Sequence, residues 1–434
     1  MNHRNYLALA IPLTLSTVTT PLLGAVDTAV VGQLPDPAYI GGVAIGTVIF
    51  NTLYWLFGFL RIGTSGFAAQ ANGADDKLQG TLAFIRPLII ALVVGIGFIV
   101  FQKPIEYIAL SLLHPAEDVA ELASGYFGIR IWGVPFTLIN YVIMGWLIGM
   151  SRVKISVLIQ IFMNLLNIVL DVVFVFGFGW GVSGVAAATL LAEVIACILG
   201  LWIIWRGTSY HFQVPSIKML ADGSSVKKMM AVNQDLFIRT ICLLAVFNLF
   251  TYKSADFGTE TLAANAVLLQ IHYLMAYFFD GLSNASSIFS GKAIGSKDRK
   301  LFQRNLELSF QWAFYSSVML LMLYWIFKES VFSFFTSIPE VIRLGYIYGD
   351  WLLFFPLVSS FGIVLYGVFT GATETVPIRN SMLLSLTVFL IAMAAGVPYL
   401  ENHGVWLAFI LFSLGRTVFL ILYVPKLNLL IRKE

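Results

Sequence analysis

The sequence predicts an all-α polytopic membrane protein with twelve transmembrane helices in two six-helix, pseudo-symmetric lobes. Three observations lead to this prediction: the composition, the number of long apolar segments, and a similarity between the two halves. Of the 434 residues, 59% are hydrophobic and 11% are charged, and the mean hydropathy is +0.87. A soluble domain typically carries about 25% charged residues. The net charge of +3, without a long basic run, gives no indication of a nucleic-acid partner.

A transmembrane helix needs about 20 consecutive, mainly apolar residues. The first span follows His3 and Arg4 directly and is too long for a signal peptide, so we expect it to be retained. Spans two, four, eight and ten are long enough to be tilted or to project from the bilayer. The predicted spans are 7–31, 40–70, 83–102, 122–149, 155–178, 184–205, 229–253, 262–291, 305–327, 343–371, 376–398 and 404–424.

The longest polar gap separates spans six and seven. It divides the chain into an N-lobe (1–206), a cytoplasmic linker (207–228) and a C-lobe (229–434). With a shift of 222 residues, "FAAQANGADDK" (67–77) aligns with "FSGKAIGSKDR" (289–299), and "YVIMGWLIGM" (141–150) with "IVLYGVFTGA" (363–372). Two matches at one shift predict an internal duplication. Six spans per half is an even number, so the repeats are expected to be parallel.

The loops on one predicted side carry far more Lys and Arg than those on the other, 18 against 4. By the positive-inside rule, both termini are expected to be cytoplasmic. Cys197 and Cys242 both lie in apolar segments, which argues against a disulfide framework.

Span one contains an aspartate in the apolar stretch "PLLGAVDTAVVG" (21–32). A charge at the centre of a membrane helix costs about 2.5–3.5 kcal/mol on insertion scales. Thr20 and Asp27 are seven residues apart and therefore share one helix face. Pro12 and Pro21 each remove a backbone hydrogen bond, so the helix can bend there.

Span five has a polar face made of Gln160, Asn164, Asn167 and Asp171, with spacings of 4, 3 and 4 residues. Asp171 and Asp27 are expected at similar depth in the same half. Two such carboxylates predict a shared site that takes up and releases a proton. The alternative is that each aspartate is structural and bonded to the polar residues of its own helix.

The second half differs, because span seven carries Asp235 and Arg239 and span eight carries Asp280. Arg239 and Asp280 are predicted to form an intramembrane polar pair. The alternative is that Arg239 extends to the cytoplasmic interface. Other charged residues within spans are expected to be packing or interfacial groups without chemistry: Arg61, Arg130, Glu193, Asp350 and Arg416.

Several function classes lack their sequence signals. There is no phosphate loop with Lys and Ser/Thr, and the five histidines show no metal-ligand spacing. The loops are too short for a catalytic domain. We therefore expect neither an enzyme nor a bound cofactor or metal.

The chain resembles the multidrug and toxic compound extrusion (MATE) transporters, in their DinF-like bacterial branch. The stretches that carry the resemblance include "ALAIPLTLSTVTTPLLGAVDTAVVGQL" (8–34), "FLRIGTSGFAAQANGADD" (59–76) and "NLLNIVLDVVFVFGFGWGVSGVAAATLLAE" (164–193). The resemblance implies the twelve-helix MATE fold, a multi-pass location in the bacterial cytoplasmic (inner) membrane, and antiport of drugs against cations by alternating access.

The resemblance also implies site residues. The family's coupling carboxylates and asparagine fall on Asp27, Asp171 and Asn167, and the proline that bends span one falls on Pro12. Residues that line the substrate cavity fall on Tyr126, Asn140 and Thr189, and Asn164 and Thr20 extend the same polar faces. Sodium-coupled members carry carboxylates deep in spans seven and ten. Span seven here has none beyond Asp235, although Asp350 stands in span ten, and this departure favours protons.

The expected function is therefore proton-coupled export of cationic or amphipathic organic compounds by a monomer in contact with membrane lipid. Coupling to Na⁺ remains an alternative, since Asp, Asn and Thr oxygens also suit a small hard cation. A second alternative is a flippase for lipids or lipid-linked oligosaccharides. The flippase would want several cations in its cavity, for which Arg61 and Arg239 are the candidates.

Overall fold

The structure, a computed structural model, describes residues 1–31, 37–207, 210, 212–335 and 338–430. Side chains are described over these residues except 20–29, 31, 37, 207 and 428–430. The described residues form helices and no strands. The chain divides into two compact units, residues 18–228 and residues 1–17 together with 229–434.

The first unit contains the larger number of helices. Helix α1 (His3–Val31) contributes its second part, and the others are α2 (Pro37–Phe57), α3 (Phe59–Gly73), α4 (Lys77–Val100), α5 (Gln102–Leu113), α6 (Glu117–Arg130), α7 (Val134–Gly149), α8 (Val153–Val172), α9 (Gly181–Trp202) and α10 (Ile217–Leu220). One 3-10 turn (Ile131–Gly133) joins α6 to α7, and π-helical turns (Val173–Gly177 and Ile203–Gly207) follow α8 and α9.

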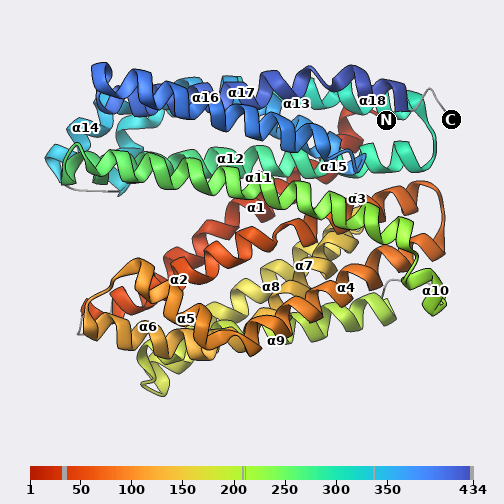
Figure 1. Cartoon of the computed structure of the whole chain (residues 1–434), viewed down its shortest axis with the longest axis horizontal. Helices are drawn as coiled ribbons and strands as arrows, with labels where there is room; N and C mark the ends of the chain where they lie inside the picture. The colour runs from red at the N-terminus through yellow and green to blue at the C-terminus, as the bar shows by residue number, and fades with distance from the viewer. Residues whose placement is uncertain (32–36, 208–209, 211, 336–337, 431–434) are drawn as a thin grey trace. The chain divides into compact units, whose positions relative to one another are not determined.

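The second unit is built from longer helices, which lie side by side along a common direction (Figure 1). They are α11 (Gly223–Ala255), α12 (Thr259–Gly295), α13 (Arg299–Phe335), α14 (Pro339–Gly349), α15 (Trp351–Gly371), α16 (Val376–Leu400), α17 (Asn402–Ile421) and α18 (Val424–Leu430).

The predicted spans agree with this arrangement. Eleven helical segments of the described chain are long and apolar enough to cross a membrane, and they correspond to predicted spans two to twelve. Helix α1 covers the first predicted span. Spans two, four and ten are each built from two helices, whereas span eight is the single helix α12. The twelve-helix membrane fold is therefore confirmed.

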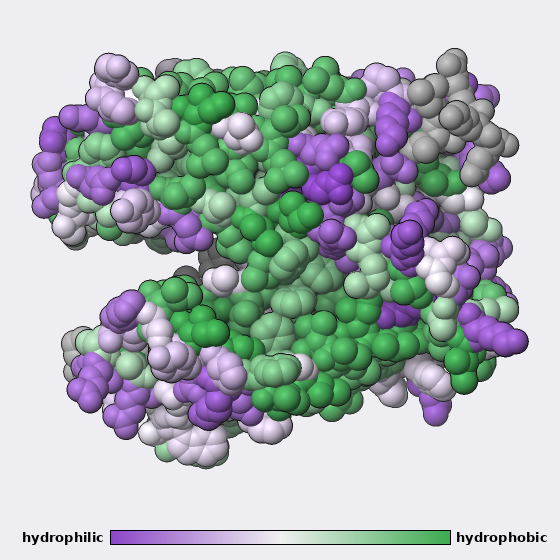
Figure 2. Space-filling view, in the orientation of Figure 1, coloured by the Kyte–Doolittle hydropathy of each residue, from purple (hydrophilic) through white to green (hydrophobic). Residues whose placement is uncertain are grey.

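The surfaces of both units fit a lipid environment. Apolar residues cover most of the middle of the helices, and hydrophilic residues gather towards the helix ends (Figure 2). On α4, for example, Leu92, Val93, Ile96 and Val100 are exposed at 39–67% of their area. Such a row would be costly in water and costs nothing against lipid tails.

The predicted duplication is visible in the backbone turns. Asp75 and Lys297, 222 residues apart, both adopt positive φ after the helices α3 and α12. Immediately afterwards, Asp76 accepts a hydrogen bond from the Gln79 amide, and Asp298 accepts one from the Leu301 amide, each at 2.9 Å. The same capped turn therefore occurs at the same place in each half.

Close helix packing repeats at the same shift. A side chain at Gly145 of α7 would clash with the Arg61 carbonyl of α3, and one at Gly367 of α15 would clash with the Ser283 carbonyl of α12. Gly149 and Gly371 lie one turn further along and meet Ser65 and Ser287 in the same way. The glycines of the two matched stretches thus allow equivalent backbone contacts, which only small residues permit in membrane helices.

We expect Gly367→Ala to lower the stability of the protein by about 1–3 kcal/mol, because the new methyl group meets backbone that cannot move aside. Gly97→Ala is the matched control, since Gly97 of α4 has nothing within 4 Å of its would-be side chain. The control is expected to be neutral or stabilising. Apparent melting temperatures in detergent measure both, and equal melting temperatures would contradict the prediction.

The start of α1 belongs to the second unit, although the sequence places residues 1–206 in one lobe. The Tyr6 hydroxyl lies 2.7 Å from Ser286 Oγ, and Thr17 Oγ1 donates to the Tyr277 carbonyl at 2.8 Å. Gly281 leaves room for Thr14. The first four turns of α1 therefore pack on α12.

The predicted linker 207–228 is partly packed as well. Phe212 stacks on the buried Trp146 ring, with 5.6 Å between centroids, and the Tyr210 hydroxyl donates to the Lys77 carbonyl at 2.6 Å. Arg86 Nη2 donates to the Met219 carbonyl at 2.6 Å. These contacts attach the segment to the first unit.

Candidate functional site

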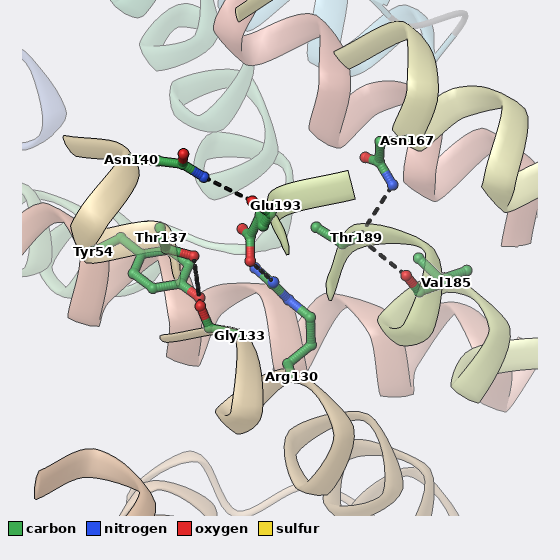
Figure 3. A network of polar contacts seen from close by, with 9 residues as sticks. All are labelled: Tyr54, Arg130, Gly133, Thr137, Asn140, Asn167, Val185, Thr189 and Glu193. Carbon is green, nitrogen blue, oxygen red and sulfur yellow. Dashed lines mark hydrogen bonds and ion pairs between the residues drawn. The ribbon is translucent and has the colours of Figure 1, made fainter. Parts of the chain in front are cut away.

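Five helices of the unit 18–228 bring polar side chains together inside an otherwise apolar bundle (Figure 3). Helix α8 supplies Asn167 and Asp171, and α9 supplies Thr189 and Glu193. Helices α2, α6 and α7 supply Tyr54, Arg130, Thr137 and Asn140. We call the seven of these residues other than Asp171 the N-unit polar network, and Asp171 lies one turn from its member Asn167 along α8.

One part of the network lies between α8 and α9. Asn167 Nδ2 donates to Thr189 Oγ1 at 3.3 Å, and Thr189 Oγ1 donates to the Val185 carbonyl at 3.0 Å. Asn167 Oδ1 is buried and accepts no hydrogen bond from the described residues. Asp171, one turn further along α8, is fully buried with 0% exposed. The site therefore offers buried oxygen atoms next to a carboxyl group.

A buried ion pair forms the other part of the network. Arg130 Nη1 donates to Glu193 Oε2 at 2.7 Å, and the two side chains are only 6% and 10% exposed. A side chain at Gly133 would place a carbon 2.9 Å from that carboxylate oxygen, so a glycine is needed there. Breaking such a pair leaves an uncompensated charge in a low-dielectric interior.

Aromatic and amide groups surround the pair. The Arg130 guanidinium carbon lies 5.1 Å from the centre of the Phe50 ring and 5.6 Å from that of Tyr54, within range for cation–π attraction. Asn140 Nδ2 donates to the Glu193 carbonyl at 3.0 Å, and Thr137 Oγ1 donates to the Tyr54 hydroxyl at 3.4 Å. The charge on Arg130 is therefore held by one carboxylate and two ring faces.

Thr189 and Glu193 connect the two parts, because residues four apart lie on the same face of a helix. The predicted site residues Asn167, Thr189 and Asn140 are thus members of one network (Figure 3).

The remaining predicted residues have different positions. Asn164 is half-buried and accepts a hydrogen bond from Gln160 at 3.1 Å. Tyr126 is buried, and its ring fills the space left by Gly46 and lies 6.2 Å from that of Phe50. Helix α1 is continuous through Pro12 and Pro21. The side chains of Asp27, Thr20 and Pro21 lie outside the described residues.

Arg130 and Glu193 were predicted to have no chemistry, and the structure makes them the charged centre of the network. A signal was available in the sequence. Arg130 and Glu193 are opposite charges at nearly the same distance from the starts of α6 and α9, and each alone would be costly in a membrane.

Among the described residues, Arg239 and Asp280, the predicted polar pair, make no direct ion pair with each other. The Arg239 guanidinium lies 4.0 Å from the centre of the Tyr366 ring on α15. Asp235 pairs with Arg379 at 2.9 Å and accepts a hydrogen bond from Thr375 at 2.8 Å. Tyr366 offers Arg239 a flat, negatively polarised face, which sequence spacing did not reveal.

Among the described residues, no group of three or more His, Cys, Asp or Glu side chains has the geometry of a metal site.

Comparisons with known proteins agree with the fold. The family model described as MatE matches residues 12–173 and again residues 236–395, once in each half. The chain is 32% identical to DNA damage-inducible protein F of Escherichia coli over 93% of this chain and 88% of that protein. It is 21% identical to the probable multidrug resistance protein NorM of Bacillus subtilis, over 85% of this chain and 82% of that one.

A solved structure has the same fold throughout. It is described as the outward-facing conformation of a multidrug resistance MATE family transporter, and its TM-score is 0.89 at 20% identity. The superposition covers 99% of this chain and 96% of the other. With two matches to the family model and a relative this similar over its length, the chain belongs to the MatE family, whose members are multidrug efflux transporters and not enzymes.

Proposed function

We propose that this transporter exports cationic or amphipathic organic compounds in exchange for protons, by alternating access. The observation that carries the proposal is the full burial of Asp171 in a membrane-spanning helix, one turn from the Asn167–Thr189 hydrogen bond. Burial disfavours the charged form of a carboxyl group, so ionising it in such a place carries a large cost in solvation free energy. Its protonation state can therefore be coupled to a change in conformation.

Asp27 is the second carboxylate of the proposed site, on the strength of the sequence. In the proposed cycle, protonation removes the negative charge of the site, helix α1 bends at Pro12 and Pro21, and the cationic substrate loses its electrostatic attraction and leaves. The multidrug resistance proteins among the relatives support small-molecule substrates of varied shape. The protein is proposed to lie in the bacterial cytoplasmic membrane with both termini cytoplasmic.

Na⁺ coupling is the principal competing proposal. Asn167 Oδ1, Thr189 Oγ1 and the Asp171 carboxylate are hard oxygen donors of the kind that a small cation prefers. Members of the N-unit polar network would then hold the ion in place of a proton.

Transport by purified protein in liposomes tests the proposal. A pH gradient and a sodium gradient are imposed separately, and the uptake or release of a fluorescent organic cation is followed. We expect the pH gradient to drive transport without sodium. Transport that responds only to sodium would favour the Na⁺ alternative, and movement of a fluorescent lipid without any cation transport would favour the flippase.

A further inference from the structure

The unit 229–434 contains a second charged cluster, which has no part in the proposed proton site. It consists of Arg239 on α11, Asp280 on α12, Tyr366 on α15 and Arg416 on α17, and we call it the two-arginine cluster. The Arg239 guanidinium lies 4.0 Å from the centre of the Tyr366 ring. Arg416 interacts electrostatically with Arg239, Asp280 and Tyr366. Both arginines and Asp280 are partly exposed.

The cluster contains more positive than negative charge. Asp235, one turn before Arg239, is already paired with Arg379. Asp280 is therefore the one carboxylate of the cluster, which holds two guanidinium groups. Among the described residues, neither Arg239 nor Arg416 forms an ion pair or donates a hydrogen bond. Their guanidinium groups lie over the rings of Tyr366 and Phe412, respectively.

Free guanidinium donors are unusual inside a membrane protein. Each guanidinium carries five N–H groups, and charged side chains within spans ordinarily pair with one another or line a polar site. Arg130, for example, pairs with the buried Glu193. Arg239 and Arg416 also repel each other, and the single carboxylate of Asp280 balances only one of their two charges.

The fold itself does not require the cluster. With the shift of 222 residues that relates the halves, Arg239, Asp280 and Arg416 correspond to Thr17, Gly58 and Val194, all uncharged. These three charges are therefore not part of the sequence pattern that repeats in the two halves. Binding of an anionic ligand accounts for the presence of the two arginines, which helix packing does not.

His272 of α12 is a further buried polar side chain of the same unit. It is 4% exposed, it interacts electrostatically with Arg416, and its Nδ1 has no hydrogen-bond partner among the described residues. Its ring lies 4.1 Å from that of Phe355 and 4.9 Å from that of Phe409. Aromatic rings also lie beside the arginines themselves, Tyr366 next to Arg239 and Phe412 next to Arg416.

We propose that the two-arginine cluster binds the anionic group of an amphipathic molecule, a carboxylate or a phosphate. The guanidinium fork matches both groups and can bind either through two parallel hydrogen bonds. The aromatic rings beside the cluster suit an apolar tail. The anion has two sources, a free amphipathic acid or the headgroup of an anionic lipid. This site lies in the unit that does not hold the N-unit polar network.

Equilibrium binding tests the proposal without any transport. The transporter is placed in nanodiscs of uncharged phosphatidylcholine, and the fluorescence of a dansyl-labelled undecanoate is compared with that of the matched dansyl undecylamine. We expect the carboxylate to bind at least about tenfold more tightly than the amine. Arg239→Gln and Arg416→Gln should each weaken carboxylate binding about tenfold or more.

Arg343→Gln is the matched control, because Arg343 is an exposed arginine of the same unit, paired with Glu340 at 2.6 Å. It should bind the carboxylate like the unmodified protein. Asp280→Asn should have the opposite effect to the arginine variants. It removes a carboxylate that competes with the ligand, so binding of the acid should become tighter. Nanodiscs with added phosphatidylglycerol identify the source, since a lipid headgroup would compete with the dye and would raise the melting temperature only when both arginines are present.

Equal binding of acid and amine, or unchanged binding in both folded glutamine variants, would overturn the proposal. So would the absence of acid binding together with no arginine-dependent effect of phosphatidylglycerol. If a glutamine variant does not fold, Arg416→Lys replaces it. In addition, unlabelled decanoate and decylamine are compared as competitors on the folded protein, and only the decanoate should displace the dye. Loss of proton-driven cation transport would not affect any of these binding results.

Discussion

Replacing Glu193 with glutamine is expected to destabilise the transporter by about 3–5 kcal/mol. The substitution leaves the shape of the side chain almost unchanged and removes the carboxylate that lies 2.7 Å from Arg130. Arg130 would then keep its charge in the interior without a counter-charge, beside a neutral amide and the Phe50 and Tyr54 rings. The apparent melting temperature and the yield of monodisperse protein in detergent measure the loss.

The double variant Arg130→Met/Glu193→Leu separates the effect of charge from that of packing. Replacing both members of a buried ion pair by apolar residues of similar volume is often neutral or stabilising. We therefore expect the double variant to melt close to the unmodified protein and well above Glu193→Gln. If Glu193→Gln alone melts like the unmodified protein, Arg130 has another counter-charge and the pair is not what holds these helices.

Asp171→Asn is expected to reduce pH-driven transport to the background of empty liposomes. An amide has nearly the same shape as a carboxyl group but does not bind or release a proton at neutral pH. Because Asp171 is fully buried in the last turn of α8, its ionisation is the step that the proposal couples to conformation. Stability should change little, since a buried charge is removed and not created.

Asp350→Asn is the matched control for Asp171→Asn. The Asp350 side chain is 61% exposed and makes a surface ion pair with Lys328 at 2.9 Å, which contributes at most about 1 kcal/mol. Transport by this variant should equal that of the unmodified protein. Full pH-driven transport by a folded Asp171→Asn protein would remove Asp171 from the coupling mechanism.

Much of the fold could be predicted from the sequence, because a bilayer forces each span to be long, apolar and helical. The span boundaries agree with the helices to within a few residues at most ends, as for predicted span 376–398 and α16 (Val376–Leu400). The duplication was also predictable, because small residues such as Gly145 and Gly367 are needed at a fixed place in each half.

The polar faces of single helices were predictable for the same reason, since helix geometry fixes which side chains share a face. Asn167 and Asp171 were found in this way. Periodicity within one helix says nothing about which other helix lies opposite. The family resemblance implied Asn167 and Thr189 separately as site residues, and the hydrogen bond between them is seen only in the structure.

The sequence by itself determined that this protein is a duplicated, twelve-span membrane protein with ionisable groups on particular helices. Only the tertiary structure decided which of those groups meet. It paired Arg130 with Glu193, placed the Arg239 guanidinium over the Tyr366 ring, and packed the start of α1 against α12. The physical reason is that a charge in a membrane interior must find its partner in space, and helices distant in sequence provide that partner.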